Sequence, residues 1–345
     1  MSEVESDEPQ SDEVVVKRVD LTPEQVLEML QKGTEIVNAR VRRLKFRGEI
    51  PYAVRFRNCV LLMPEFNGVT FKEAVTFFSC TLDRPQFQRK IVMEKDLKLD
   101  GSIVNKAVFA RMTLKGQLFA AHTEFRGKIQ FNDCVFEQRV SFWEAKFNAW
   151  SDFKNCQFHG EADFRSLHAE QGFVLTNSHF HENFLFRGSN VEKKFQADGC
   201  TFDKLLDLSK AKLHDFAYLE AIKQGPQQTF GFLNTVAERI RIQPAQVEGR
   251  LASEQAGNHE DAMQEYGLLK KCYSALHRFD HEDWAFYRFK VAQRRAKPTS
   301  WRRPWTIWRH FFEWVFLDIG CGYCTNPVRA VRMAVLEKVM GAQPE

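Results

Sequence analysis

The sequence predicts a mainly β solenoid, and three observations carry this prediction. Phenylalanine supplies 32 of the 345 residues, against 6 Tyr and 7 Trp. Large apolar residues recur in pairs five residues apart, with a small residue two positions before the second, as in Phe131, Cys134 and Phe136. The unit returns every 11 residues over most of the range 36–213, and every 10 at its start. Spacings of 5 and 6 fit neither a helix nor a plain alternating strand, so we expect short straight faces wound into coils.

Four such faces would close one square coil, so two 11-residue units make a coil of about 22 residues. About eight coils would then stack at ~4.8 Å, with Phe over Phe inside. Phe suits this interior better than Tyr because each buried Tyr hydroxyl would need a partner. An ordinary β-sandwich of short strands is the competing fold. The residues predicted to form the core include Phe56, Phe77, Phe131, Phe136, Phe142, Phe147, Phe153, Phe158, Phe164, Cys134, Cys156 and Cys200.

The small residue before each large one also connects the chain with a known family. Segments such as Ala162-Asp-Phe164 and Cys156-Gln-Phe158 resemble the repeat of pentapeptide-repeat proteins, and the resemblance covers about half of the chain. It implies a right-handed quadrilateral β-helix. The chain departs from a strict period of five by one added residue on every second face, which we assign to a looser corner.

The ends of the repeat divide the chain into four parts. Thr22 and Pro23 have the form of an N-cap followed by Pro at the first helical position, which predicts a helix that covers the first coil. After Leu213, the spacing of Ala262, Tyr266, Leu269 and Tyr273 predicts an amphipathic helix with a packing face, and 230–242 and 244–255 are weaker helix candidates. The predicted parts are an acidic disordered tail (1–20), a capping helix (21–35), the β-helix (36–213) and an α-helical C-terminal domain (214–345).

The C-terminal part contains a basic aromatic segment. Between Trp284 and Arg309 there are eight bases and no acid. Bases interleaved with Trp and Tyr suit an anionic membrane surface, or single-stranded nucleic acid, and a solvated helix whose rings pack on the domain is the third interpretation. The residues predicted to contact a membrane or partner are Trp284, Arg288, Arg294, Arg295, Trp301, Arg302, Arg303, Trp305, Trp308 and Arg309.

The residues that follow, 311–329, resemble the C-terminal extension of membrane-associated bacterial pentapeptide-repeat proteins. They contain an aromatic stretch, a Gly-Tyr turn, Pro327 and Arg329. In those proteins transmembrane helices come next, whereas residues 328–345 here carry Arg329, Arg332, Glu337 and Lys338. We therefore expect peripheral membrane contact, or a soluble truncation of a longer protein.

No catalytic residues, cofactor or metal are predicted. The eight dispersed cysteines and the lack of a signal-peptide pattern indicate free thiols in the cytoplasm. Cys321 and Cys324 form a C-x-x-C, but no surrounding βαβ pattern supports redox chemistry, and one such pair is at most half of a zinc site. His159 and His181 fall one coil apart on one outward track, and His179 is near His181 in the sequence. A metal site or pH-sensitive patch is conceivable there, but we favour a solvated face.

Charge discriminates among the function classes. Some members of the resembled family mimic B-form DNA and bind type II topoisomerases, which requires an acidic rod. Residues 36–213 instead hold 28 Lys and Arg against 20 Asp and Glu, a net charge of +8. We therefore predict a non-catalytic binding or scaffold protein, cytoplasmic and peripheral at the inner membrane. Its partners would be an unidentified protein, an anionic membrane surface or a second copy of the chain, with nucleic acid less favoured.

Overall fold

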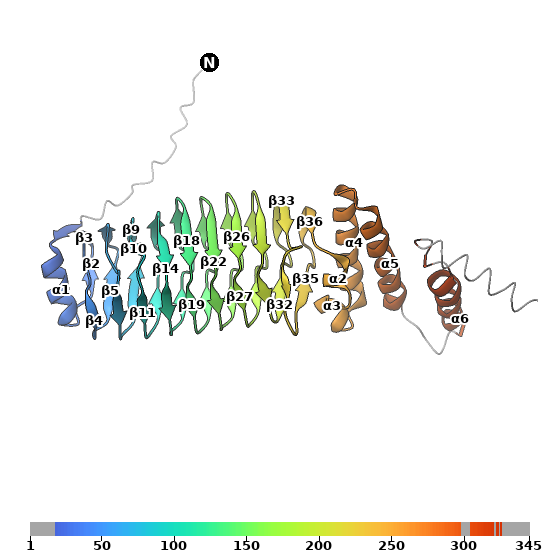
Figure 1. Ribbon diagram of the computed structural model, residues 1–345, viewed down its shortest axis with the longest axis horizontal. Coiled ribbons are helices and arrows are strands. Elements are labelled where there is room, and N and C mark those ends of the chain that lie inside the picture. The colour runs from blue at the N-terminus through green and yellow to red at the C-terminus, as the bar shows by residue number, and fades with distance from the viewer. Residues whose placement is uncertain (1–17, 298–303, 321, 324, 326–345) are drawn as a thin grey trace, which may run out of the picture.

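The structure is a rod of stacked parallel β coils with helices at both ends (Figure 1). It is a computed structural model and describes residues 18–297, 304–320, 322, 323 and 325. The rod has about 10 turns. Three hydrogen-bonded sheets of 17, 9 and 10 strands run along it, and the largest of them supplies two of the four faces. The predicted fold class is therefore confirmed.

One middle coil shows how the repeat builds the four faces. It contains the short strands β19 (Val135–Phe136), β20 (Val140–Ser141), β21 (Lys146–Phe147) and β22 (Ser151–Lys154). Each strand pairs in parallel with its counterpart one coil away. β18 (Ile129–Asn132), β22 and β26 (Phe173–Thr176) form one such ladder, with Phe131 opposite Phe153 and Phe153 opposite Leu175. These registers confirm the coil length that the sequence predicts.

Two kinds of corner explain the added residue. Tight corners place one residue in the left-handed region every 11 residues, as at Asp133 (φ 53°), Glu144 (φ 53°) and Asn155 (φ 54°). The wider corners, at 137–139 and 148–150, lie between an inward Phe and the next inward residue and are one residue longer. The added residue is thus at a corner, as the sequence indicated.

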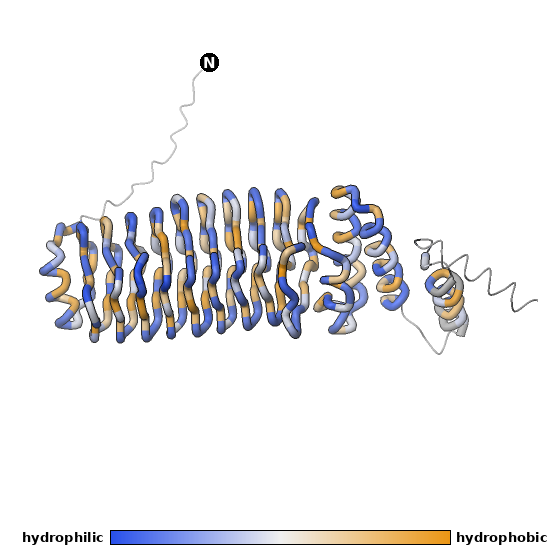
Figure 2. The backbone as a smooth tube through the Cα atoms, viewed as in Figure 1, coloured by the Kyte–Doolittle hydropathy of each residue, from blue (hydrophilic) through white to orange (hydrophobic). Residues whose placement is uncertain are grey.

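The core consists of columns of phenylalanine. Phe109, Phe131 and Phe153 stack nearly parallel, with ring centroids 4.5 and 4.6 Å apart. All twelve residues predicted for the core are at most 2% exposed. Hydrophobic and hydrophilic residues alternate along the coils (Figure 2), because successive side chains of a strand point to opposite sides. The two buried tyrosines, Tyr266 and Tyr273, lie outside the solenoid, and their hydroxyls donate to Glu254 and to the carbonyl of Ile242.

The N-terminal end is closed by helix α1 (Pro23–Gln31), which buries Val26 and Leu30. Thr22 accepts a hydrogen bond from the Gln25 amide and forms a capping box, so the N-cap predicted from the sequence is present. Strand β1 (Val19–Leu21) precedes the helix and pairs with β3 (Ala39–Arg42). The boundary predicted at residue 20 is therefore too late, because the Val19 amide already donates to the carbonyl of Asn38.

The C-terminal boundary that the sequence predicts for the solenoid, at Leu213, is too early. Coiling continues beyond Leu213, so the predicted helix over 230–242 is wrong. The repeat is hidden there because the coil lengthens: Leu206 pairs with Phe184 on one side and with the more distant Phe230 on the other, and a bulge interrupts the pairing after Leu213. Residues 36–241 keep a net charge of +8. The strands that extend the solenoid are β33 (Lys212–Tyr218), β34 (Lys223–Gln224), β35 (Thr229–Gly231) and β36 (Val236–Arg241).

The last coil is covered by α4 (His259–Ala275), the predicted amphipathic helix. Its buried face includes Ala262, Tyr266, Leu269 and Tyr273. Two short helices, α2 (Pro244–Val247) and α3 (Ala252–Gln255), precede it, and α5 (Phe279–Ala296), α6 (Pro304–Phe312) and the π-helix η1 (Glu313–Gly320) follow it. No helix among the described residues is long and apolar enough to cross a membrane.

Candidate functional site

The basic aromatic segment begins in α5, and its first aromatic residue is part of the helical packing. Trp284 lies edge-on to Tyr266 and Tyr273 of α4, with ring centroids 5.7 and 6.5 Å apart, and packs against the core. Much of the ring therefore serves the packing of the helices, and its contact with a partner stays a prediction. Its ring joins α5 to α4, as the third interpretation of the segment proposed.

Arg288 is likewise part of a buried polar network. Its guanidinium donates to Glu254 at 2.7 Å and to the Tyr266 hydroxyl at 3.3 Å, and its side chain is 18% exposed. Tyr266 in turn donates to Glu254 at 2.6 Å, and burial raises the pKa of Tyr266 so that it stays a donor at neutral pH. Arg288 therefore holds α5 to α3 and α4, and its contact with a membrane or partner stays a prediction.

Several remaining bases of the segment are paired with acids outside it. Arg294 contacts Asp318 at 2.7 Å, and Lys297 contacts Glu313 at 2.9 Å, so both ion pairs join the C-terminal end of α5 to η1. Arg309 lies 3.9 Å from Glu313, and Arg295 lies 3.8 Å from Glu254. With Arg288, five of the eight bases therefore lie within 4.0 Å of an acid, although the segment itself contains none. Arg295 and Arg309 keep about half of their side-chain surface exposed.

The aromatic residues of α6 and η1 are the strongest surface feature of this region. Trp305 is 76% exposed and Trp308 is 56% exposed, which leaves both rings available for the contact that the sequence suggested. Four more large apolar residues that follow Trp308 are 42–49% exposed, and the site prediction did not include them. Their spacing of three and four residues was the available signal. We call this set the aromatic surface; it consists of Trp305, Trp308, Phe311, Phe312, Trp314 and Leu317. Trp301, Arg302 and Arg303 lie outside the described residues.

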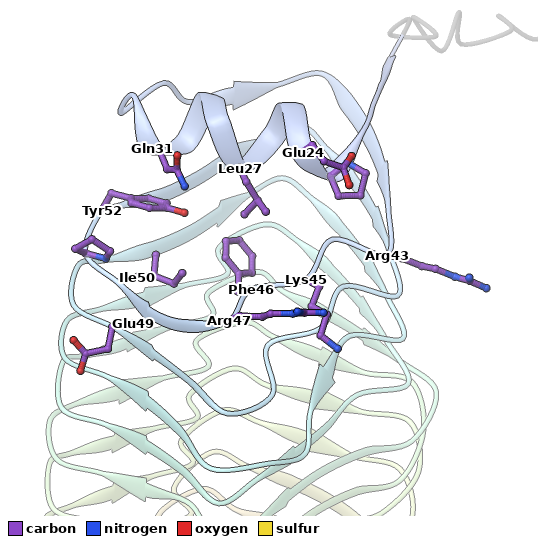
Figure 3. Close-up of a pocket in the computed structure, with 12 residues that line it drawn as sticks. Glu24, Leu27, Gln31, Arg43, Lys45, Phe46, Arg47, Glu49, Ile50 and Tyr52 are labelled. Carbon is purple, nitrogen blue, oxygen red and sulfur yellow. The ribbon is translucent and has the colours of Figure 1, made fainter.

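The opposite end of the rod has a pocket of about 660 Å³, which lies between α1 and the first coils. Leu27 of α1 points toward Phe46, Ile50 lies beside it, and Arg43 is directed outward (Figure 3). Lys45 and Arg47 also line it, and Lys45 pairs with Glu65 at 2.7 Å. The pocket exists only because a helix meets a coil, so repeat spacing could not predict it.

Six cysteines are buried, and burial keeps Cys200 and Cys272 in the unreactive thiol form. Five of them occupy the solenoid interior, where the repeat placed them, and Cys272 packs between α4 and the last coil. Burial raises the pKa of Cys200 to about 12 and that of Cys272 to about 11, so both thiols are protonated at neutral pH. Cys321 and Cys324 lie outside the described residues.

The coils and the comparison with known families agree on the class of protein. Coils with four short faces and a small residue two positions before each stacked Phe define a pentapeptide-type β-solenoid. A family model of pentapeptide repeats, in nine copies, matches residues 120–167, within the most regular coils. Residues 120–167 thus match the pentapeptide-repeat family, and the structure is a β-solenoid with a C-terminal helical region. No curated protein and no solved structure matches it.

Proposed function

We propose that this protein is a non-catalytic binding protein that attaches to an anionic membrane surface through its aromatic surface. One observation carries the proposal: six large apolar side chains between Trp305 and Leu317 are each at least 42% exposed. Exposed apolar patches of this kind mark interaction sites. Half of the six are tryptophans, whose rings favour the depth of lipid headgroups.

The energetics favour reversible attachment. Complete burial of one large apolar side chain contributes about 1.5–3 kcal/mol. The residues here are about half exposed, so each contributes a fraction of that amount on insertion. Each base near an anionic surface adds about 1 kcal/mol. Arg295 and Arg309 are half exposed, and Arg302 and Arg303 precede the aromatic surface in sequence. Two or three inserted rings with two bases would give weak, salt-sensitive binding.

The solenoid would then act as a stiff spacer. Ten coils at about 4.8 Å span roughly 50 Å, so the end closed by α1 would lie well away from the aromatic surface. The pocket at that end is available for a protein partner. This arrangement is that of a scaffold, in which the rod connects two contact sites.

Co-sedimentation with vesicles tests the proposal. The full chain would be mixed with vesicles of phosphatidylcholine alone, and with vesicles of two parts phosphatidylcholine to one part phosphatidylserine. We expect sedimentation with the anionic vesicles, most of it lost at high salt. Trp305→Ala/Trp308→Ala should abolish it. The matched control is Trp143→Ala/Trp150→Ala, which removes two solenoid tryptophans that are 40% and 45% exposed.

Two results would overturn membrane binding. One is a wild-type chain that stays in the supernatant with both vesicle types. The other is an equal loss of binding in the two double variants, which would show that the aromatic surface has no special part in it. The alternative is a homodimer formed through the aromatic surface. Sedimentation velocity of the wild type and the two double variants would reveal it.

A further inference from the structure

We propose that His179, His181 and Asp203 form a binding site for one divalent transition-metal ion of the Zn²⁺ class on an outward face of the solenoid. This inference is independent of the proposed membrane contact, because the site lies on the coils and shares no residue with the aromatic surface. The sequence brings His159, His179 and His181 near one another, but it does not single out Asp203 as their neighbour.

The fold brings the three side chains together for two reasons. In β27 (His179–Phe180), Phe180 is fully buried, so the residues on either side of it point outward together. β27 pairs with β31 (Thr201–Phe202), with Phe180 opposite Phe202, so Asp203 takes the position of His181 one coil later. The Asp203 amide donates to the carbonyl of Phe180 at 2.9 Å, which fixes this register.

The ligand atoms already converge. Nε2 of His179 lies 2.9 Å from Oδ2 of Asp203, and Nδ1 of His181 lies 3.0 Å from the same oxygen. The three ligand atoms all lie within 4.8 Å of one another. Each of these ring nitrogens can donate a hydrogen bond to the carboxylate only when it carries the proton. A metal ion would instead bind both nitrogens in their unprotonated form, with the single proton of each neutral ring on its other nitrogen.

The donor set indicates the class of metal. Two imidazoles and one carboxylate are the ligands of open zinc sites, which leave a fourth position for water or another ligand. Imidazole also suits Ni²⁺ and Cu²⁺, whereas Mg²⁺ and Ca²⁺ prefer sites made of oxygen alone. His159 lies next to the set, one coil earlier. Its ring stacks on that of His181 with centroids 4.6 Å apart.

Stacked coils align many outward residues, so alignment alone does not make a site. His122 faces one acid, Glu144, and His168 contacts the amide of Asn190, which also bonds to Glu192 and His214. Within the part of the chain that the structure describes, no other group of three His, Cys, Asp or Glu side chains converges in this way. The side chains of the three ligands are 20–33% exposed, which leaves the site open to ions from solvent.

Isothermal titration calorimetry would test the site directly. The full chain would be prepared without an affinity tag, in a Cys321→Ser/Cys324→Ser background that removes the C-x-x-C, and treated with a chelator. We expect one equivalent of Zn²⁺ to bind and Mg²⁺ to give no signal. His181→Ala and Asp203→Ala should each weaken Zn²⁺ binding by at least about tenfold, since even the loss of a supporting contact commonly costs that much. His168→Ala is the matched control and should bind as the background does.

Thermal unfolding provides the second measurement. Zn²⁺ should raise the unfolding temperature of the background and of His168→Ala, because the ion joins two coils and binds only the folded chain. It should not do so for His181→Ala, whose unfolding temperature in chelator should match the background because the ring is on the surface. The proposal is overturned if Zn²⁺ does not bind the background, or if His181→Ala and Asp203→Ala bind it as tightly.

Discussion

The solenoid and the helical C-terminal region solve the same problem of buried polar groups in opposite ways. In the solenoid each coil hydrogen-bonds to the next, so the interior needs only apolar rings and small spacers. The last coil has no successor. There the buried carboxylate of Glu265, from α4, accepts the Phe232 amide at 2.6 Å and a hydrogen bond from Ser253. Within the repeat, neighbouring coils satisfy each other's backbone hydrogen bonds. At the end of the repeat, a few specific side chains do so.

The two regions also differ at the surface. On the solenoid, Trp143 and Trp150 are 40% and 45% exposed. In α6 and η1, the exposed rings of Trp308, Phe311, Phe312 and Trp314 contact one another, with centroids 6.0–6.2 Å apart. The proposed membrane contact is thus assigned to the part of the chain that the repeat does not explain.

The largest effect should come from removing a ring in the middle of the solenoid. Phe153 is fully buried and contacts Phe131, Phe142 and Phe164. Phe153→Ala should lower the free energy of unfolding by about 3–5 kcal/mol because it leaves a cavity in a stacked column. Urea unfolding followed by circular dichroism measures this. Phe153→Leu is the control and should cost clearly less; an equal cost for both would contradict the cavity explanation.

The next effect concerns the end of the rod. Glu265→Ala leaves the Phe232 amide buried without an acceptor and should cost about 1–3 kcal/mol. Glu265→Gln keeps an acceptor and removes a buried charge, so it should be much better tolerated. Similar losses of unfolding free energy for the two variants in urea would show that Glu265 is not needed as the acceptor that a further coil would otherwise provide.

A tight corner should give a smaller change. Ser166 has φ 55°, in the left-handed region, where a β-branched side chain is strongly disfavoured. Ser166→Val should destabilise the protein by about 1–2 kcal/mol. Ser166→Gly should be neutral at this corner because glycine adopts positive φ readily. If Val and Gly give the same unfolding free energy, the corner conformation is not a constraint.

Buried carboxylates in the two regions should respond to pH in opposite directions. Burial raises the pKa of Glu265, so its contribution to stability is full below the unfolded-state value, about 4.3, and is lost as pH rises through the folded value. At Asp163, burial acts to raise the pKa, but Arg165 and Arg139, at 2.7 and 2.8 Å, hold it below its usual value. Its contribution is present above about pH 3.9 and is lost as pH falls through the folded value.

Unfolding free energies between pH 3 and 7 would measure this contrast. Glu265→Gln should gain stability relative to the wild type as pH rises. Asp163→Asn should lose stability relative to the wild type over the same change. Parallel pH profiles for the two variants would contradict the assignment of opposite environments.

The smallest effect on stability should come from the aromatic surface. Trp308→Ala removes a ring that is 56% exposed and should change the unfolding free energy by no more than about 0.5 kcal/mol. Thermal unfolding of Trp308→Ala beside wild type measures this. A loss as large as that of Glu265→Ala would mean that the ring supports the fold, and the aromatic surface would then be a packing face.

Prediction from the sequence worked where the chain is periodic. Phe131 and Phe153 could be assigned to one column because identical surroundings recur once in every coil. The prediction failed where the spacing between inward residues changes. A step of 11 residues from Phe77 leads to Gln88, but Phe87 fills the inward position, stacked between Phe66 and Phe109. Beyond Leu213 the coil lengthens and the pattern no longer identifies it.

By itself the sequence determined the solenoid, the length of its coil, its Phe and Cys interior and its basic charge, because a short-range repeat encodes contacts between equivalent positions. The tertiary structure decided which bases are free and which side chains converge. Arg288 and Arg294 are neutralised by Glu254 and Asp318, which belong to other helices and lie far from them in the chain. No periodicity links those positions, since such contacts depend on how non-repeating helices pack against one another.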